Sequence, residues 1–114
     1  MSIATIGDVE FGEDLPAFTP DTSLENVVEF CDAIGWNGPR FRSHEAAQEL
    51  GLPWALIPGI MSQGFLAAMI HRWGPEATIE KIDTVFRAPV FCDQPCNITG
   101  VVTDVDEDTG GVEV

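Results

Sequence analysis

The 114-residue sequence has few basic residues: five Lys and Arg stand against 19 Asp and Glu, which gives a formal net charge of −14. A protein this acidic repels nucleic-acid phosphates and anionic membrane surfaces, so we expect it to bind neither nucleic acid nor a membrane. The five cations all lie in the middle of the chain and form a candidate patch for an anionic ligand. They are Arg40, Arg42, Arg72, Lys81 and Arg87.

Cysteine is also scarce, with three residues, an odd number that argues against a disulfide framework and for a reducing compartment. The N-terminal MSIATIGDVEF lacks the basic start and apolar run of a signal peptide. Cys92 and Cys96 lack a second pair of ligands, so no metal site is expected. These features predict a cytoplasmic protein.

One apolar window, residues 54–70, has nearly the length of a membrane span. It is interrupted by Pro58, Gly59 and Gly64, so we interpret it as part of a folded core. Hydrophobic residues make up 45% of the chain, which suits a single domain over residues 1–114.

Two helices are predicted before this window. The first covers residues 24–34, with Thr22 and Glu25 as a capping box and Gly35 as its stop. The second covers residues 44–50, with Ser43 as its cap. A loop, WNGPRFRS, joins them.

The third predicted helix begins after Pro58 and Gly59 and covers residues 60–73. It is apolar nearly all round, so we expect the fold to enclose it on most sides. Strands are predicted over residues 78–91 and 97–105, and a turn at residues 106–111 leads to a third strand. Residues 1–20 are predicted to be extended and turn-like.

Helices followed by strands indicate an α+β fold, with an antiparallel sheet curled around the long third helix. The sequence stops at Val114, three residues into the last predicted strand. We therefore expect the domain to be incomplete at its C-terminus, with that strand completed elsewhere.

Between Phe30 and Ile70, the segment Gly35–Ser43, Ala47 and the segment Ile57–Ile60 follow one another at a spacing that resembles the MaoC-like, or R-specific, enoyl-CoA hydratases and dehydratases. The family signature reads approximately G-D-x-N-P-x-H-x-D, then Ala, then A-H-G-M at the head of the central helix. Here the corresponding residues are GWNGPRFRS from Gly35 to Ser43, then Ala47, then IPGI from Ile57 to Ile60. The later RWGPEATIEKIDTVFRAPVFCDQP is similar to the family's strand after that helix. The resemblance implies a hot-dog fold, a 2-enoyl-CoA thioester as substrate, and no other cofactor.

In this family an Asp and a His, five residues apart, activate water and protonate the substrate. The positions that correspond hold Trp36 and Phe41, or Gly35 and Arg40 if the alignment shifts by one residue. None of these side chains accepts a proton near neutral pH. His44, three residues beyond Phe41, is the candidate for a rebuilt catalytic site.

The substrate-binding part of the resemblance is better preserved. Gly59 matches the family glycine whose amide, at the N-terminus of the central helix, faces the thioester carbonyl. A helix N-terminus offers free N–H groups and positive potential to a developing enolate, although Gly59 also serves simply to let the chain turn. The residues that the resemblance implies for substrate binding are Trp36, Asn37, Arg40, Phe41, Gly59, Ile60 and Ser62.

The resemblance leaves three functions open. The first is a subunit that binds an acyl-CoA-type thioester but is not catalytic by itself, and that pairs with a catalytic hot-dog partner in a homo- or hetero-oligomer. The second is an active enoyl-CoA hydratase whose site is rebuilt around His44. The third is an acyl- or lipid-binding hot-dog protein without enzymatic activity.

Overall fold

A computed structural model describes residues 5–114 and divides into two compact units. The hairpin unit contains the described part of the first 19 residues together with Leu66–Ile82 and Asn97–Val114. The helix unit contains Pro20–Phe65 and Asp83–Cys96. The extended backbone expected for residues 1–4 lies outside the described residues.

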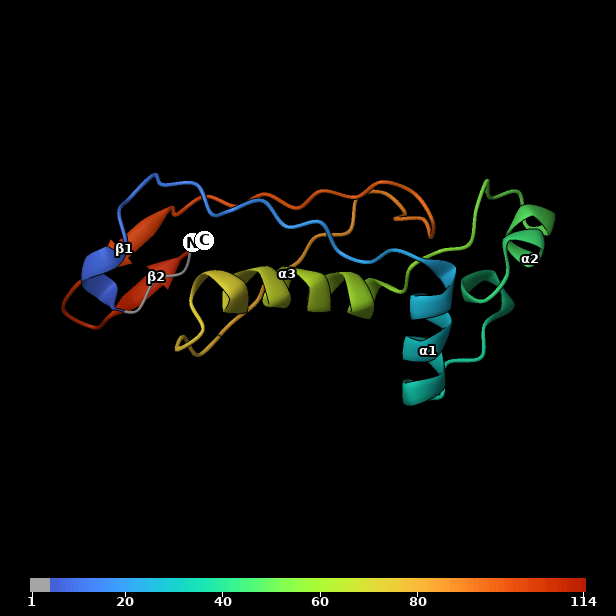
Figure 1. The fold of residues 1–114 in the computed structure, drawn as a ribbon, viewed down its shortest axis with the longest axis horizontal. Helices are drawn as coiled ribbons and strands as arrows, with labels where there is room; N and C mark the ends of the chain where they lie inside the picture. The colour runs from blue at the N-terminus through green and yellow to red at the C-terminus, as the bar shows by residue number, and fades with distance from the viewer. Residues whose placement is uncertain (1–4) are drawn as a thin grey trace. The chain divides into compact units, whose positions relative to one another are not determined.

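The first helix of the helix unit, α1, covers Leu24–Ile34 (Figure 1). Its cap differs from the predicted one: the Ser23 side chain accepts the N–H of Asn26 at 3.2 Å. The predicted capping box fails because the Thr22 hydroxyl is used elsewhere, donating to the Gln94 carbonyl at 2.8 Å. The predicted stop is confirmed, since Gly35 adopts a left-handed φ of 71° that residues with a Cβ rarely tolerate.

A 3-10 turn, η2 at Pro39–Phe41, and the helix α2 at His44–Glu49 follow α1. The Ser43 hydroxyl accepts the N–H of Ala46 at 3.2 Å, as the sequence predicts. Helix α2 ends one residue earlier than expected, and Gly51 then takes a φ of 87° to turn the chain.

The long helix α3 covers Gly59–Trp73, in agreement with the prediction. Pro58 precedes it and has no N–H to leave unsatisfied, while its carbonyl accepts the N–H groups of Met61 and Ser62, both at 3.0 Å. Enclosure on most sides was predicted, but Ile60 is 56% exposed and Gly64 is exposed. The chain therefore covers α3 less completely than the apolar sequence implies.

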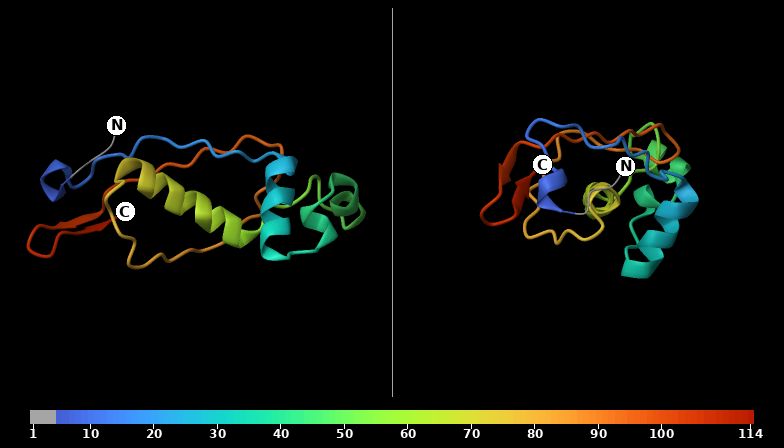
Figure 2. Two further views of the ribbon diagram at one scale, coloured as in Figure 1. Left: turned by 60° about the horizontal axis from the view of Figure 1, so that its bottom comes forward. Right: turned by 60° about the vertical axis from the view of Figure 1, so that its left-hand side comes forward.

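The hairpin unit begins with a 3-10 turn, η1 at Ile6–Asp8, and ends in a two-stranded antiparallel sheet. Strand β1, Asp104–Asp106, pairs with β2, Gly111–Glu113, with Val105 opposite Val112. Upstream, bridges join Asp14 to Val101 and Phe18 to Ile98, so the two extended segments run side by side (Figure 2).

The predicted strand over residues 78–91 is wrong for most of its length. The segment is irregular until Phe91, which forms a single antiparallel bridge with Leu56. A strand exists only when it is paired, and Pro89 has no N–H to give to a ladder. Val85 and Phe86 within it are exposed, so the strand-like composition of this segment is not matched by a partner among the described residues.

Each unit has its own hydrophobic core, and α3 contributes to both. In the helix unit the buried residues are Val27, Cys31, Phe41, Ala55, Ile57, Met61 and Cys92. In the hairpin unit they are Val9, Leu15, Met69, Trp73 and Val102. Within residues 5–114, no helix combines the length and the hydrophobicity needed to cross a membrane.

The buried cysteines provide a test of the helix-unit core. Burial raises the pKa of Cys31 and raises that of Cys92 to about 11. Because the thiolate is the reactive form, we expect a thiol reagent such as DTNB to modify the half-buried Cys96 well before the other two. Denatured protein, the control, should react at all three thiols. Rapid modification of Cys92 in the native protein would contradict this core.

Candidate functional site

The start of α3, which we call the amide end, consists of Pro58, Gly59 and Ile60. The first intrahelical bonds of α3 are donated by Met61 and Ser62, so the N–H groups of Gly59 and Ile60 precede the helical ladder. Such amides carry the positive end of the helix dipole. Pro58 is fully buried, whereas Gly59 and Ile60 are exposed, which leaves the end open to an anionic oxygen.

Phe86 covers the Cα of Gly59. A Cβ built at residue 59 lies 3.2 Å from Cζ of the Phe86 ring, closer than most side chains allow. Phe86 is 60% exposed, so its ring is free to move aside at low cost. The Phe86 ring therefore packs on the Cα of Gly59, and a side chain at residue 59 would have to displace it.

The loop between α1 and α2 is organised around Phe41. This ring is only 7% exposed, and Trp36 meets it edge-on with 5.5 Å between the ring centroids. The Arg40 guanidinium lies over the same ring, with Cζ 4.9 Å from the centroid. Phe41 therefore supports the loop from the core, while Trp36, Asn37 and Arg40 are exposed on it.

A backbone hydrogen bond joins this loop to the segment before α3. The N–H of Leu56 donates to the Arg40 carbonyl at 2.9 Å, and Phe41 shares its core cluster with Ile57 and Met61. The structure thus brings the loop and the amide end together within one unit. Ser62 is half-buried one turn into α3.

The cations of the helix unit have different roles. Arg42 is used structurally: its Nη2 lies 2.7 Å from Asp32, and its Nε donates to the Trp36 carbonyl. Arg40 lies in the same loop as Arg42 but forms no ion pair among the described residues. Arg72 belongs to the hairpin unit, where it lies over Phe18 with Cζ 4.7 Å from the ring centroid.

Both ring nitrogens of His44 are engaged. Nδ1 accepts the N–H of Ala55 at 2.9 Å, and Nε2 lies 2.7 Å from Oδ2 of Asp93. A backbone N–H only donates, so Nδ1 holds no proton and the neutral ring carries its proton on Nε2. The contact with Asp93 is therefore a hydrogen bond to a carboxylate, and in this arrangement neither nitrogen has a lone pair free for water.

Asp93 is the important residue that the sequence analysis missed. It bonds to His44, and its Oδ1 also accepts the N–H of Leu24 at 3.1 Å, which adds a second cap to α1. Its φ of 60° is left-handed, a conformation that Asp tolerates better than most residues. The signal available in the sequence was the turn composition of Cys92-Asp93-Gln94-Pro95.

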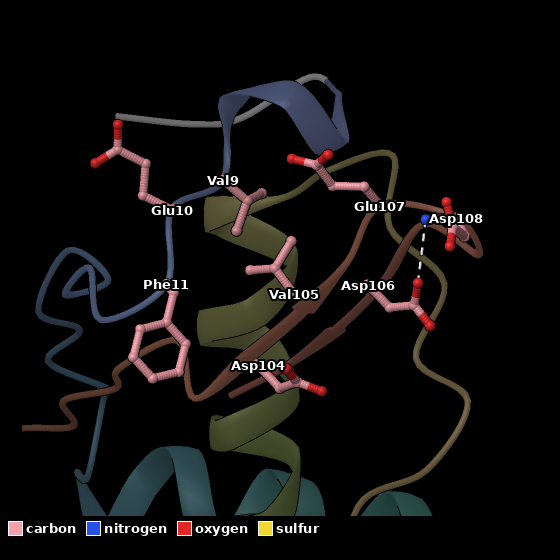
Figure 3. A pocket seen from close by; sticks show the side chains of 8 residues that line it. All are labelled: Val9, Glu10, Phe11, Asp104, Val105, Asp106, Glu107 and Asp108. Atoms are coloured by element: carbon pink, nitrogen blue, oxygen red, sulfur yellow. Dashed lines mark hydrogen bonds between the residues drawn. The ribbon is translucent and has the colours of Figure 1, made fainter.

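A hollow lies in the hairpin unit, and none of the predicted site residues lines it. It has a volume of about 710 Å³ and is lined by Val9, Phe11, Val105 and five carboxylates: Glu10, Asp104, Asp106, Glu107 and Asp108 (Figure 3). The N–H of Asp108 donates to Oδ1 of Asp106 at 3.1 Å. This concentration of negative charge repels the phosphates of a coenzyme A ligand. Among residues 5–114, no group of three His, Cys, Asp or Glu side chains is placed to hold a metal ion.

Several solved structures resemble this one. A chain of the ChsH1–ChsH2 complex from Mycobacterium tuberculosis matches with a TM-score of 0.77 and 19% identity, over 86% of this chain and 78% of that chain. A MaoC-like dehydratase matches with a TM-score of 0.78 and 20% identity, over 93% of this chain and 34% of that chain. The chain has the hot-dog fold. The α+β hot-dog prediction is thereby confirmed.

A chain of the C-terminally truncated HadBC complex from Mycobacterium tuberculosis, a 3R-hydroxyacyl-ACP dehydratase, also matches. Its TM-score is 0.56 and its identity 19%, over 92% of this chain and 92% of that chain. This hot-dog chain spans about a third of the length of the MaoC-like dehydratase but most of the other two chains. Comparison with family models gives no match, and comparison with curated sequences gives none either.

The Asp93 network predicts a specific acid response. Hydrogen bonds from His44 and from the Leu24 N–H hold the pKa of Asp93 below its usual value of 3.8. A carboxyl group with a lowered folded-state pKa stabilises the protein above its unfolded pKa, and that contribution disappears as the pH falls through the folded pKa. We expect Asp93→Asn to be less stable at neutral pH and to lose less stability below about pH 4.

Urea unfolding measured at a series of pH values tests this expectation. Glu29→Gln, which removes an exposed carboxylate on α1, is a control for the loss of one negative charge. An unchanged pH dependence in Asp93→Asn would contradict the role given to this carboxylate.

Proposed function

We propose that this chain is a MaoC-like hydratase or dehydratase subunit that binds a 2-enoyl-CoA-type thioester and depends on a catalytic hot-dog partner for turnover. The observation that carries the proposal is the amide end of α3. It offers the amides of two exposed residues, Gly59 and Ile60, beside a loop on which Trp36, Asn37 and Arg40 are exposed.

The amide end suits a thioester carbonyl. Hydrogen-bond donors fixed at a helix N-terminus stabilise the negative charge that develops on the carbonyl oxygen when an enolate forms. Arg40 is linked to this segment, because its carbonyl is bonded to the N–H of Leu56, three residues before Gly59. Arg87 is a second cation close by in sequence, since it directly follows Phe86, whose ring contacts the Gly59 position. The exposed guanidinium of Arg40 suits a CoA phosphate.

The need for a partner follows from the side chains at the acid–base positions. Trp36 and Phe41, or Gly35 and Arg40, supply no proton acceptor, and both nitrogens of His44 are engaged. The subunit therefore contributes binding, and a second subunit supplies the proton transfer. Its neighbours in structure include chains of the ChsH1–ChsH2 and HadBC complexes, which supports pairing with an unlike hot-dog chain.

Exposed apolar side chains also favour a partner. Within the helix unit, Trp36, Trp54, Ile60, Val85 and Phe86 are each at least 40% exposed. Phe86 packs against Gly59, the neighbour of Ile60, so an apolar area borders the amide end, and exposed apolar areas mark interaction sites in soluble proteins. The unpaired segment that contains Val85 and Phe86 has the composition of a strand, so a neighbouring chain is able to provide the pairing that this chain does not.

Hydration of crotonyl-CoA, followed by loss of the enoyl absorbance, tests the proposal. We expect no turnover from the isolated chain and clear turnover when it is co-purified with a MaoC-like subunit that retains the Asp and His pair. That subunit alone is the control. Robust turnover by this chain alone would favour the rebuilt site at His44, and acyl binding without turnover in any pair would favour a carrier.

Gly59→Ala tests the amide end directly. The added methyl meets the Phe86 ring, with Cζ 3.2 Å from the Cβ position, so either the methyl or the displaced ring narrows the approach to the Gly59 amide. We expect affinity for butyryl-CoA to fall about tenfold, as for one lost hydrogen bond, while the fold is kept because only the exposed Phe86 ring must shift.

Gly64→Ala is the matched control, five residues along the same helix. Its Cβ meets no atom within 4 Å, so it should raise stability by about 0.5–1 kcal/mol without changing affinity. Isothermal titration calorimetry and urea unfolding measure the two effects. Equal affinity in both variants would contradict a thioester site at Gly59.

A further inference from the structure

The segment that leads into α3, residues 55–58, has all its backbone N–H groups engaged. Leu56 donates to the Arg40 carbonyl at 2.9 Å, and Ile57 donates to the Val90 carbonyl at 2.8 Å. Pro58 has no N–H. The remaining donor, Ala55, is the one whose acceptor is a side chain: Nδ1 of His44 at 2.9 Å.

The N–H of Ala55 is buried, so its hydrogen bond to His44 cannot be replaced by a bond to water. Ala55 is 0% exposed, and its carbonyl accepts the N–H of Cys92 at 2.8 Å. Without His44, the Ala55 N–H would be buried with no acceptor, and the chain would shift to satisfy it. Gly59 is only four residues further on, with no flexible linker between the two.

The His44 ring is held from its other sides too. Nε2–H donates to Asp93, and the edge of the ring faces Trp54 with 5.5 Å between centroids. Asp93 is in turn fixed by the Leu24 N–H and by its own N–H, which donates to the Thr22 carbonyl at 2.8 Å. A ring restrained in this way sets where Ala55 lies.

We propose that His44 is a positioning residue: as the neutral Nε2–H tautomer, it fixes residues 55–58 and thereby the place of the Gly59 amide. Its effect on ligand affinity rests on the proposed thioester site, whereas its effect on Ala55 does not. His44 thus acts through the backbone, and it exchanges no proton with the substrate.

Three substitutions distinguish the contact of Nδ1 with Ala55 from the contact of Nε2 with Asp93. His44→Asn places an amide oxygen close to the position of Nδ1, so it keeps an acceptor for Ala55 and loses the contact with Asp93. His44→Gln reaches toward Asp93 but offers Ala55 nothing. His44→Ala removes both. If the alanine variant fails to fold, the comparison of Asn with Gln still decides the question.

Two readouts report on the position of Ala55. Nitrogen-15 NMR of the histidine rings should show the proton of His44 on Nε2 in the wild-type protein. Hydrogen exchange at the Ala55 amide should be slow in the wild-type protein and in His44→Asn, and at least tenfold faster in His44→Gln and His44→Ala. A proton on Nδ1, or full Ala55 protection in His44→Gln, would overturn the proposal.

Affinity for butyryl-CoA and turnover with the partner subunit give the functional readout. We expect His44→Asn to bind within about threefold of the wild type, and His44→Gln and His44→Ala to bind about tenfold more weakly. If His44 were the general base, His44→Asn would bind normally yet support no turnover, which would overturn a positioning role.

The two proposals fail in different ways. Absence of butyryl-CoA binding in the wild-type protein, with or without the partner, would overturn the thioester site while the Ala55 exchange pattern still decides the role of His44. Normal binding that is unchanged in all three variants would overturn the link from His44 to Gly59.

Discussion

The hydrogen bonding of residues 55–58 is the constraint on which the candidate site depends. The three N–H groups of this segment each have a different acceptor. Nδ1 of His44 accepts the N–H of Ala55, the Arg40 carbonyl accepts that of Leu56, and the Val90 carbonyl accepts that of Ile57. Pro58 follows and starts the helix, and the amides of Gly59 and Ile60 precede its hydrogen-bonded ladder. The loop, α2 and the irregular segment before Cys92 all meet at this one stretch of backbone.

The two units of this acidic protein differ in how their charged side chains are arranged. Five carboxylates line the hollow in the hairpin unit, while the helix unit carries Arg40 on an exposed loop and holds Arg42 in an ion pair with Asp32. In a chain of net charge −14, an anionic ligand is accepted only where a local cation or a helix dipole offsets the overall field. The amide end of α3 meets this requirement without adding a charged side chain.

Local signals in the sequence predicted the helices well, because capping and stopping depend on neighbouring residues such as Ser43 and Gly35. The segment 78–91 was predicted wrongly, because strand formation depends on a pairing partner and not on composition alone. The Thr22 cap failed for a similar reason, since a contact with Gln94, far away in sequence, claimed its hydroxyl. The His44–Asp93 link, 49 residues apart, has no local signature, so the sequence placed His44 near the site without revealing what holds it.

Backbone amide NMR on the labelled protein, titrated with butyryl-CoA, tests most directly whether a thioester binds at the start of α3. The account predicts that the largest chemical-shift changes occur at the amides of Gly59 and Ile60, with smaller changes along residues 36–41. Changes confined to the hairpin unit, with Gly59 and Ile60 unmoved at saturation, would contradict it.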